Sequence, residues 1–420
     1  MVQDNPVMNE LEEMANFCTS GHRKGFFKKK RETRLYIYGH DEVHRMISKY
    51  LHYAEIRIDG FLMAHVRECD RYGEPFPIIS LSELPNISSE CYVKVIIAES
   101  DEIKNQVIRL LRELKTDETY LVSDWNMRTI PKKMVPRKVE DFYLEVNLAD
   151  HCNLNCQCCD HFSPIAKKTF LDYDQYVKDI KRLASLTGGK MGLMKLQGGE
   201  PLLNDRVIDY MKVTREVFPD SPVCLFTDGL LLPKLGREPD PRKNFWEAVK
   251  KYEIEVRMTQ YPIPIKMEAI VDVAKEHGID VIFEPLPCLT RGARLWIFSE
   301  IGAGDYKGVK HSVKHPFDLE KKVEKFRYIS CYQFNESIVL RDGKIYTCPM
   351  IPYSHYFNEA YDTNLEVKDD CFIDIYQAVS YEEIAEFCTR RTSFCDYCAV
   401  HKRFAMPWKQ SSHGMHEWSL

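Results

Sequence analysis

The sequence lacks long hydrophobic runs, a strong excess of one charge and a secretory signal. No stretch of about 18 or more consecutive apolar residues occurs, so a membrane-spanning helix is not expected. The formal net charge of the 420 residues is −5, which does not favour binding to nucleic acid. The opening segment, MVQDNPVMNELEEMANF, is acidic and amphipathic, unlike a signal peptide. We therefore expect a cytoplasmic protein.

Internal repeats and low-complexity tracts are also absent from the sequence. Hydrophobic residues make up 44% and charged residues 29%, so the chain can bury ordinary globular cores and is not expected to be disordered. The length of 420 residues predicts two or three domains.

Cysteine, in contrast, is abundant, with 15 residues. In a reducing compartment, clustered thiols indicate metal ligands or redox groups rather than disulfides. One cluster lies within residues 152–159, and a looser group lies within residues 331–398. These groups divide the chain into three parts, residues 1–130, 140–325 and 326–420, which we predict to be separate domains.

Residues 1–130 alternate between strand-like and helix-like patterns after a predicted helix within residues 1–20. The expected strands are RLYIY, Ile56–Leu62, Pro77–Ile79 and Val93–Ile97, and a helix is expected over Glu102–Leu114. This alternation predicts a Rossmann-like parallel sheet.

The first strand-to-helix turn of this part departs from a dinucleotide-binding turn. It reads Gly39-His40-Asp41-Glu42-Val43-His44, so only the first of the three glycines is present. The carboxylates of Asp41 and Glu42 would repel a phosphate. We interpret residues 1–130 as a scaffold or docking domain, with binding of a small molecule as the alternative, and the basic run Lys24–Arg34 as a solvated face.

The segment NMRTIPKKMVPRKVED contains two prolines and is predicted to be a turn-rich linker. A regular strand–helix alternation follows it. Strands are expected at Phe142–Asn147, Gly192–Gln197, Val223–Thr227, Glu253–Thr259 and Val281–Glu284, with helices at Asp172–Leu186, Asp205–Phe218, Pro241–Tyr252 and Pro264–His277. This spacing predicts a complete or open (β/α) barrel, whose reactive groups collect at the carboxyl ends of the strands.

Three cysteines follow the first predicted barrel strand with C-x3-C-x2-C spacing: Cys152, Cys156 and Cys159. Thiolates so placed can face one centre, whereas a structural zinc ion prefers four ligands. A [4Fe–4S] cluster held by three cysteines keeps one iron open. In this position the spacing resembles the radical SAM superfamily, with zinc as the alternative.

A second motif strengthens the resemblance. Gly198, Gly199, Glu200 and Pro201 follow the next strand and resemble the turn that holds the amino group of S-adenosyl-L-methionine in that superfamily. The resemblance also implies cofactor contacts by three residues after later strands, Asp228, Arg257 and Thr259. One departure is Cys158, where the superfamily usually has an aromatic residue; Phe162 is the candidate replacement.

The C-terminal cysteines resemble a shortened SPASM extension, called twitch, of radical SAM enzymes. Cys331, Gly343 and Cys348 have C-x11-G-x4-C spacing, and Cys395 and Cys398 form a C-x2-C pair. The resemblance implies a second, auxiliary [4Fe–4S] cluster held by the four cysteines. A zinc ion with four thiolate ligands is the alternative, because spacing alone does not separate the two.

Taken together, the resemblance implies a partial (β/α)6 radical SAM barrel between an N-terminal Rossmann-like domain and a small C-terminal twitch-like domain. It implies an enzyme that reductively cleaves S-adenosyl-L-methionine to a 5′-deoxyadenosyl radical. The expected substrate is carbohydrate-type, meaning a sugar, aminocyclitol or glycan intermediate, and the expected electron donor is a flavodoxin or ferredoxin. Alternatives are a maturase of a ribosomally made peptide and a non-catalytic iron–sulfur or zinc scaffold.

Two reaction types remain open at this stage. A dehydrogenase needs a base near the substrate radical, for which Arg291, Tyr261 and His311 are candidates. An epimerase needs a thiol that returns a hydrogen atom. The candidate catalytic thiols are Cys288, Cys371 and Cys388.

Overall fold

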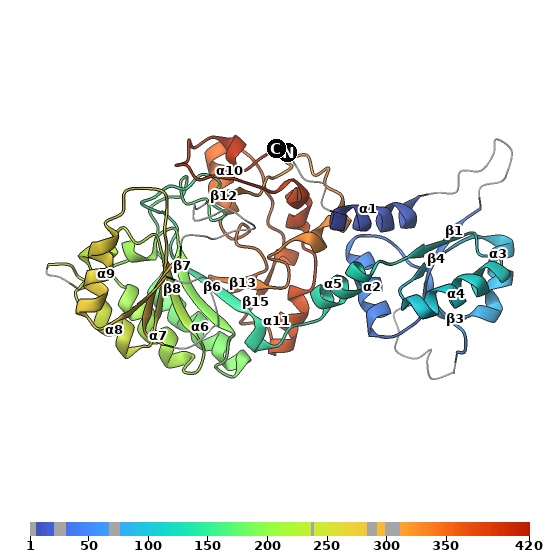
Figure 1. The fold of residues 1–420 in the computed structure, drawn as a ribbon, viewed down its shortest axis with the longest axis horizontal. Helices are drawn as coiled ribbons and strands as arrows, with labels where there is room; N and C mark the ends of the chain where they lie inside the picture. Colours follow the sequence, from blue (N-terminus) through green and yellow to red (C-terminus); the bar gives the residue numbers. More distant parts are fainter. Residues whose placement is uncertain (1–5, 21–30, 67–75, 237–238, 284–291, 299–310) are drawn as a thin grey trace. The chain divides into compact units, whose positions relative to one another are not determined.

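The computed structural model describes residues 6–20, 31–66, 76–236, 239–283, 292–298 and 311–420 (Figure 1). The chain divides into two compact units. The N-terminal unit comprises Met1–Val135, Glu324–Cys331 and Thr389–Arg391, and the barrel unit comprises Pro136–Val323, Tyr332–Cys388 and Thr392–Leu420. Each unit is described by itself.

The N-terminal unit contains a five-stranded parallel sheet in the order β3-β2-β1-β4-β5. This is the order of the first five strands of a doubly wound dinucleotide-binding fold, so the expected parallel alternation is confirmed. Its strands are β1 (Thr33–Tyr38), β2 (Gly60–Met63), β3 (Ile78–Ser80), β4 (Tyr92–Ile97) and β5 (Glu118–Leu121). Its helices are α1 (Pro6–Thr19), α2 (Glu42–Tyr53), α3 (Leu84–Glu90), α4 (Asp101–Glu113) and α5 (Asp124–Met134).

The turn between β1 and α2 is held by contacts among its own residues. Asp41 caps α2 by accepting from the backbone N–H of His44, and the His44 ring lies 2.6 Å from the Asp41 carboxylate. A Cβ atom at Gly39 would lie 2.3 Å from the His44 ring. The space after the first glycine is therefore filled by His44, in agreement with the loss of the phosphate-binding pattern.

The prediction of a turn-rich linker was wrong for most of its length, because residues up to Met134 form helix α5. Ser123 caps this helix by accepting from the N–H of Asn126, and Asn126, Ile130 and Met134 form a buried stripe at a spacing of four residues. This helical stripe outweighs Pro131, which stands in the last turn. The boundary between the units follows Val135.

The barrel unit contains a nine-stranded sheet in the order β10-β11-β9-β8-β7-β6-β13-β14-β15. Strands β6 to β11 are parallel to their neighbours, as the barrel prediction requires. They are β6 (Tyr143–Ala149), β7 (Leu193–Gly198), β8 (Val223–Thr227), β9 (Glu255–Thr259), β10 (Asp280–Ile282) and β11 (Arg294–Phe298). Strand β11 was not predicted, and it lies between β9 and β10.

Four helices cover one side of these strands (Figure 1). They are α6 (Tyr173–Thr187), α7 (Val207–Val217), α8 (Phe245–Lys251) and α9 (Met267–Glu276), each close to its predicted position. Apolar side chains from β6, β7 and β8 pack with those of the helices into one core. Among the described helices, none combines the length and the apolar character needed to cross a bilayer.

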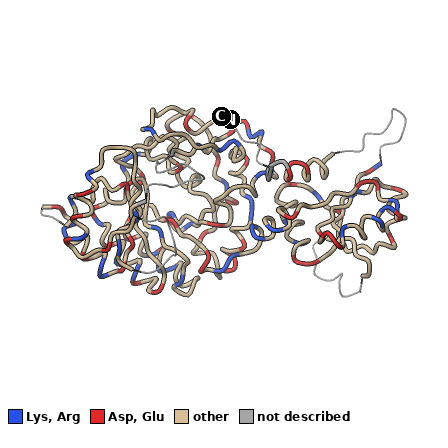
Figure 2. The backbone as a smooth tube through the Cα atoms, in the orientation of Figure 1, with Lys and Arg blue, Asp and Glu red and all other residues tan. Residues whose placement is uncertain are grey.

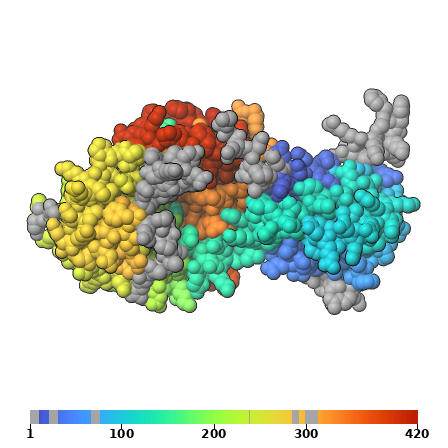
Figure 3. Space-filling view, viewed as in Figure 1, coloured from blue at the N-terminus to red at the C-terminus, as the bar shows by residue number. Residues whose placement is uncertain are grey.

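The C-terminal part of the chain continues the barrel sheet. Strand β13 (Ser337–Arg341) pairs in parallel with β6, and β14 (Lys344–Tyr346) and β15 (Phe372–Asp374) extend the sheet in antiparallel pairs. A separate ribbon joins β12 (His311–Lys314) and β16 (Phe404–Pro407). Helices α10 (Ser354–Tyr361) and α11 (Tyr381–Cys388) complete this part, and its last residues form one edge of the barrel unit in Figure 3.

Charged side chains of both signs are interspersed along the backbone of each unit (Figure 2). This mixture agrees with the small net charge of −5.

Candidate active site

A cavity of about 690 Å³ lies at the carboxyl ends of the barrel strands. Its walls include the cysteine loop after β6 and the residues that end β7, β8 and β9, as the barrel prediction requires. The ribbon of β12 and β16 forms a further wall. The lining residues with predicted roles are Cys152, Cys156, Cys159, Gly198, Gly199, Asp228, Thr259 and Tyr261.

The three predicted cluster ligands thus line one cavity. Burial alone would raise the pKa of the Cys159 thiol, but a hydrogen bond and the positive charge of His161 lower it, which favours a thiolate. The pKa of Cys152 is raised by burial and by the charges of Asp228 and Glu200. Within the described ranges, no three His, Cys, Asp or Glu side chains already form a close metal-binding group.

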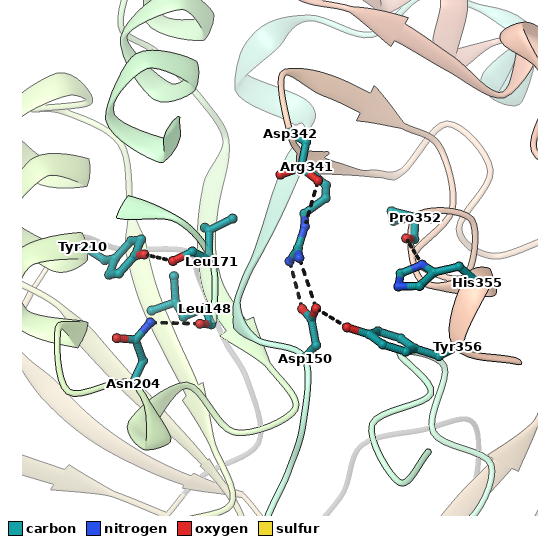
Figure 4. Close-up of polar contacts among 10 residues, drawn as sticks. All are labelled: Leu148, Asp150, Leu171, Asn204, Tyr210, Arg341, Asp342, Pro352, His355 and Tyr356. Atoms are coloured by element: carbon teal, nitrogen blue, oxygen red, sulfur yellow. Dashed lines mark hydrogen bonds and ion pairs between the residues drawn. The ribbon is translucent and has the colours of Figure 1, made fainter. Parts of the chain in front are cut away.

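The residue before the cysteine loop is held by a buried ion pair (Figure 4). Asp150 accepts from both terminal nitrogens of Arg341, at 2.8 and 3.1 Å, and from the hydroxyl of Tyr356 at 2.7 Å. Its side chain has no exposed surface. Because Arg341 ends β13 and Tyr356 lies on α10, the C-terminal part of the chain holds the base of the loop.

The Gly198-Gly199-Glu200 turn packs directly on the start of the same loop. A Cβ atom at Gly198 would lie 2.3 Å from the carbonyl oxygen of Ala149, and one at Gly199 would lie 2.1 Å from that of His151. The N–H of Gly199 donates to Ala149 and that of Glu200 to His151. Both glycines are therefore required for backbone-to-backbone contact, besides lining the cavity.

Glu200 and Asp228 form a buried carboxylate pair beside Cys152. Glu200 is 1% exposed and accepts from the N–H of Asp228 and the hydroxyl of Thr227, both at 2.8 Å. Burial and the neighbouring Asp228 raise the pKa of Glu200, and burial raises the pKa of Asp228 to about 6. Neither forms an ion pair with a lysine or arginine of the described chain. A bound cation would therefore be stabilised here.

The remaining predicted cofactor contacts differ in position. Thr259 lines the cavity, whereas Pro201 begins the short 3-10 helix η4 (Pro201–Leu203) and does not line it. Arg257 does not line the cavity either, because its guanidinium pairs with buried Glu255. Phe162, the candidate replacement for the aromatic residue missing at Cys158, packs instead against Trp418 and other rings of a hydrophobic core.

The C-terminal tail binds the cysteine loop through hydrogen bonds, and we call these contacts the strap. This role was not predicted from the sequence. Gln157 N–H donates to the carbonyl of Lys409, and Ser411 N–H donates to that of Asn155, so the two segments pair like strands. The Trp418 indole donates to the carbonyl of Cys159 at 2.9 Å. The only signal in the sequence was the aromatic and serine-rich composition of the tail.

Glu417 completes this strap. Its buried carboxylate accepts from Ser411 and Ser412 and, at 3.4 Å, from the N–H of Cys158. Burial alone would raise the pKa of Glu417, but hydrogen bonds from Ser412 and Ser411 lower it. The ionised carboxylate therefore joins the tail to the cysteine loop.

Comparisons with known proteins bear on the family of this chain. No protein-family model matches it. A GTP 3′,8-cyclase of Clostridium perfringens (strain SM101 / Type A) is 33% identical over 93 residues, 21% of this chain and 28% of that protein. A GTP 3′,8-cyclase of Sulfurovum sp. (strain NBC37-1) is 26% identical over 152 residues, 34% of this chain and 46% of that protein. The chain thus spans less than half the length of these curated relatives.

The curated matches support the radical SAM superfamily for this chain. A solved structure of BtrN in complex with AdoMet and 2-DOIA is 14% identical and covers 61% of this chain and 92% of that chain, with a TM-score of 0.36. The support for the superfamily comes from the curated matches.

The cavity is not lined by the described candidate thiols for hydrogen return. Cys388 ends α11 inside the barrel core, where burial raises its pKa, and Cys371 packs in a second core against Ser393. Cys288 lies outside the described residues, as does Arg291, and the side chain of His311 is not described. Tyr261 lines the cavity, and burial and the nearby Cys156 raise its pKa.

The predicted auxiliary cysteines fall in both units. Cys395 lies in the 3-10 helix η8 (Ser393–Tyr397), Cys398 follows it, and Cys348 packs against the second core of the barrel unit. Cys331 belongs to the N-terminal unit, where its carbonyl accepts from Lys133. An auxiliary cluster therefore stays a prediction from spacing.

Proposed function

We propose that this chain is a radical SAM enzyme whose cluster is held by Cys152, Cys156 and Cys159. The observation that carries the proposal is the meeting of these three thiols with Gly198, Gly199 and Asp228 at one cavity. Glu200 is buried and does not line the cavity, but it accepts a hydrogen bond from the N–H of Asp228. The residues fit the cofactors by their chemistry: three thiols suit a [4Fe–4S] cluster with one open iron, and two buried carboxylates suit an ammonium group. When bound, the [4Fe–4S] cluster and S-adenosyl-L-methionine together would supply a carbon radical that removes hydrogen from an unactivated C–H bond.

The residues of the chain position and shield this chemistry. Glu200, with Asp228 beside it, binds the amino group of S-adenosyl-L-methionine. Thr259 binds a polar group of S-adenosyl-L-methionine. The close packing of Gly199 on His151 fixes the distance between the Gly-Gly-Glu turn and the cysteine loop. The rings of Tyr261 and Trp408, whose centroids are 5.7 Å apart, exclude water from one side.

The proposed substrate is carbohydrate-type, and four polar side chains of the cavity wall support this. Gln157, Ser163, Ser312 and Trp408 line it, and each has a buried polar side-chain atom with no hydrogen-bond partner among the described residues. Buried polar groups require partners, and the hydroxyl groups of a sugar would provide them. The proposed reaction is oxidation or epimerisation, and the proposed donor of electrons is a flavodoxin or ferredoxin.

Anaerobic reconstitution tests the proposal. With dithionite and S-adenosyl-L-methionine, the wild-type protein is expected to form 5′-deoxyadenosine and Cys156→Ala is expected to form none. Cys224→Ala, which changes a buried thiol of β8, is the matched control and should retain formation. Absence of 5′-deoxyadenosine from a protein with a full iron complement would refute the proposal.

Two further measurements test the auxiliary metal site and the reaction type. Iron near eight per chain supports a second [4Fe–4S] cluster on Cys331, Cys348, Cys395 and Cys398, whereas about four with one zinc supports a zinc site. In D2O, an epimerase introduces one deuterium at carbon and forms no ketone. A dehydrogenase forms the ketone.

A further inference from the structure

The cavity wall formed by the β12–β16 ribbon carries a cation, Arg403, that has no acidic partner among the described residues. Arg403, directly before β16, lines the cavity, and its guanidinium lies over the Tyr332 ring at 4.3 Å. No carboxylate of the described chain lies within ion-pair distance of Arg403. Asp160, an acidic residue of the cysteine loop that also lines the cavity, accepts from the Tyr332 hydroxyl at 3.4 Å.

His315 stands beside this arginine. The ribbon pairs Lys314 with Phe404, so His315 and Arg403 are the next residues at the same end of the two strands. The His315 ring lies edge-on to Tyr332 at 5.3 Å, and its Nδ1 is 3.9 Å from Asp160. Burial and the charge of Arg403 lower the pKa of His315, although Asp160 opposes this. A neutral imidazole therefore faces the cavity, able to donate to or accept from a hydroxyl group.

Ser312 of the same ribbon has a buried hydroxyl group that a polar ligand could bind. Its side-chain oxygen is buried and has no hydrogen-bond partner among the described residues, and the residue is 4% exposed. Ser312, His315 and Arg403 thus present a hydroxyl, an imidazole and a guanidinium to one cavity.

We propose that Arg403 binds an anionic substituent of the substrate, a carboxylate or a phosphate, while His315 and Ser312 bind its hydroxyl groups. The inference rests on the proposed function and narrows it to an acidic sugar or a sugar phosphate. A guanidinium matches the two oxygens of either anion with parallel hydrogen bonds. The stack on Tyr332 holds the guanidinium plane in place for this contact.

The test is calorimetric titration of the anaerobically reconstituted full chain. The probes are glucose 1-phosphate, galactose 1-phosphate, glucuronate, galacturonate and neutral glucose. We expect at least one acidic sugar to bind more tightly than glucose, and the preferred anion separates phosphate from carboxylate. Arg403→Gln should weaken that binding by about tenfold or more, as expected for one charge-assisted contact. Lys402→Gln, which changes the exposed neighbouring cation, should bind like the wild type.

Three results would overturn the inference: no acidic sugar binds, glucose binds equally well, or Arg403→Gln weakens binding of S-adenosyl-L-methionine instead. The last result would indicate that the Arg403 guanidinium binds the carboxylate of S-adenosyl-L-methionine. Formation of 5′-deoxyadenosine is measured separately. Acidic sugars that bind through Arg403 in a protein unable to cleave S-adenosyl-L-methionine would leave this inference standing and refute the proposed function.

Discussion

Replacement of Asp150 by asparagine is expected to destabilise the barrel unit and the cysteine loop together. The carboxylate is fully buried, binds Arg341 through two hydrogen bonds and accepts a third from Tyr356 (Figure 4). Asp150→Asn leaves the guanidinium without its buried counter-charge. Breaking such a pair typically costs about 3–5 kcal/mol. At roughly 2–4 °C per kcal/mol, Tm should fall by roughly 6–20 °C.

Arg341 offers its own internal control. The same guanidinium also contacts Asp342 through its Nε at 3.3 Å, but the Asp342 side chain is 69% exposed. Water already screens this contact, so Asp342→Asn should cost less than about 1 kcal/mol. Tyr356→Phe, which removes one hydrogen bond to the buried carboxylate, should fall between the two, at about 1.5–3 kcal/mol.

Calorimetric unfolding of the three variants measures their losses of Tm. The iron content after reconstitution measures how well the cysteine loop holds a cluster. Since Asp150 is two residues before Cys152, we expect Asp150→Asn to retain less iron than Asp342→Asn. Equal losses of Tm in these two variants would refute the reasoning from burial. A Tm unchanged by Asp150→Asn would refute the role of the ion pair.

Three further predictions concern the loop and its neighbours. Gly199→Ala should cost roughly 3 kcal/mol, measured by chemical unfolding, because its Cβ would lie 2.1 Å from the His151 carbonyl; an unchanged midpoint would contradict the close contact. Glu417→Gln should lower Tm at neutral pH. Because the folded pKa of Glu417 is lowered, its stabilisation is present above the unfolded value of about 4.3 and is lost as pH falls through the folded pKa. Wild type and variant should therefore converge in acid, and a constant difference would exclude the carboxylate as the cause. Glu200→Gln should weaken S-adenosyl-L-methionine binding about tenfold or more in anaerobic equilibrium dialysis, and an unchanged affinity would exclude the ammonium contact.

Local patterns were sufficient for the parallel strands and for the residues at their ends. The strand before Asp150 and the strand before Gly199 were predicted within a few residues, because each is an apolar run followed by polar or glycine-rich sequence. Strand β5 was missed because it is short and largely exposed. Helix α5 was missed because the prolines were given more weight than the buried stripe that ends at Met134.

Contacts between distant segments were beyond any local pattern. The pairing of Gln157 with Lys409 joins residues whose sequence neighbours show no shared periodicity, and the bond between Asp150 and Arg341 depends on β13 lying beside β6. Nor does sequence spacing distinguish a thiol that lines the cavity from one that packs in a core. Cys388 was a reasonable candidate until its position inside the barrel core was known.

The division between what was predictable and what was not has a functional meaning. The cysteine loop and the Gly-Gly-Glu turn are short and contiguous, and they hold the chemistry proposed for the whole superfamily. A further wall is assembled from residues within 312–315 and 403–408, which the ribbon of β12 and β16 brings together. A substrate bound against that wall is selected by residues that no contiguous motif contains. Exchange of Arg403 should therefore change which molecule binds and leave formation of 5′-deoxyadenosine intact, whereas exchange of Cys156 should abolish that formation for every substrate.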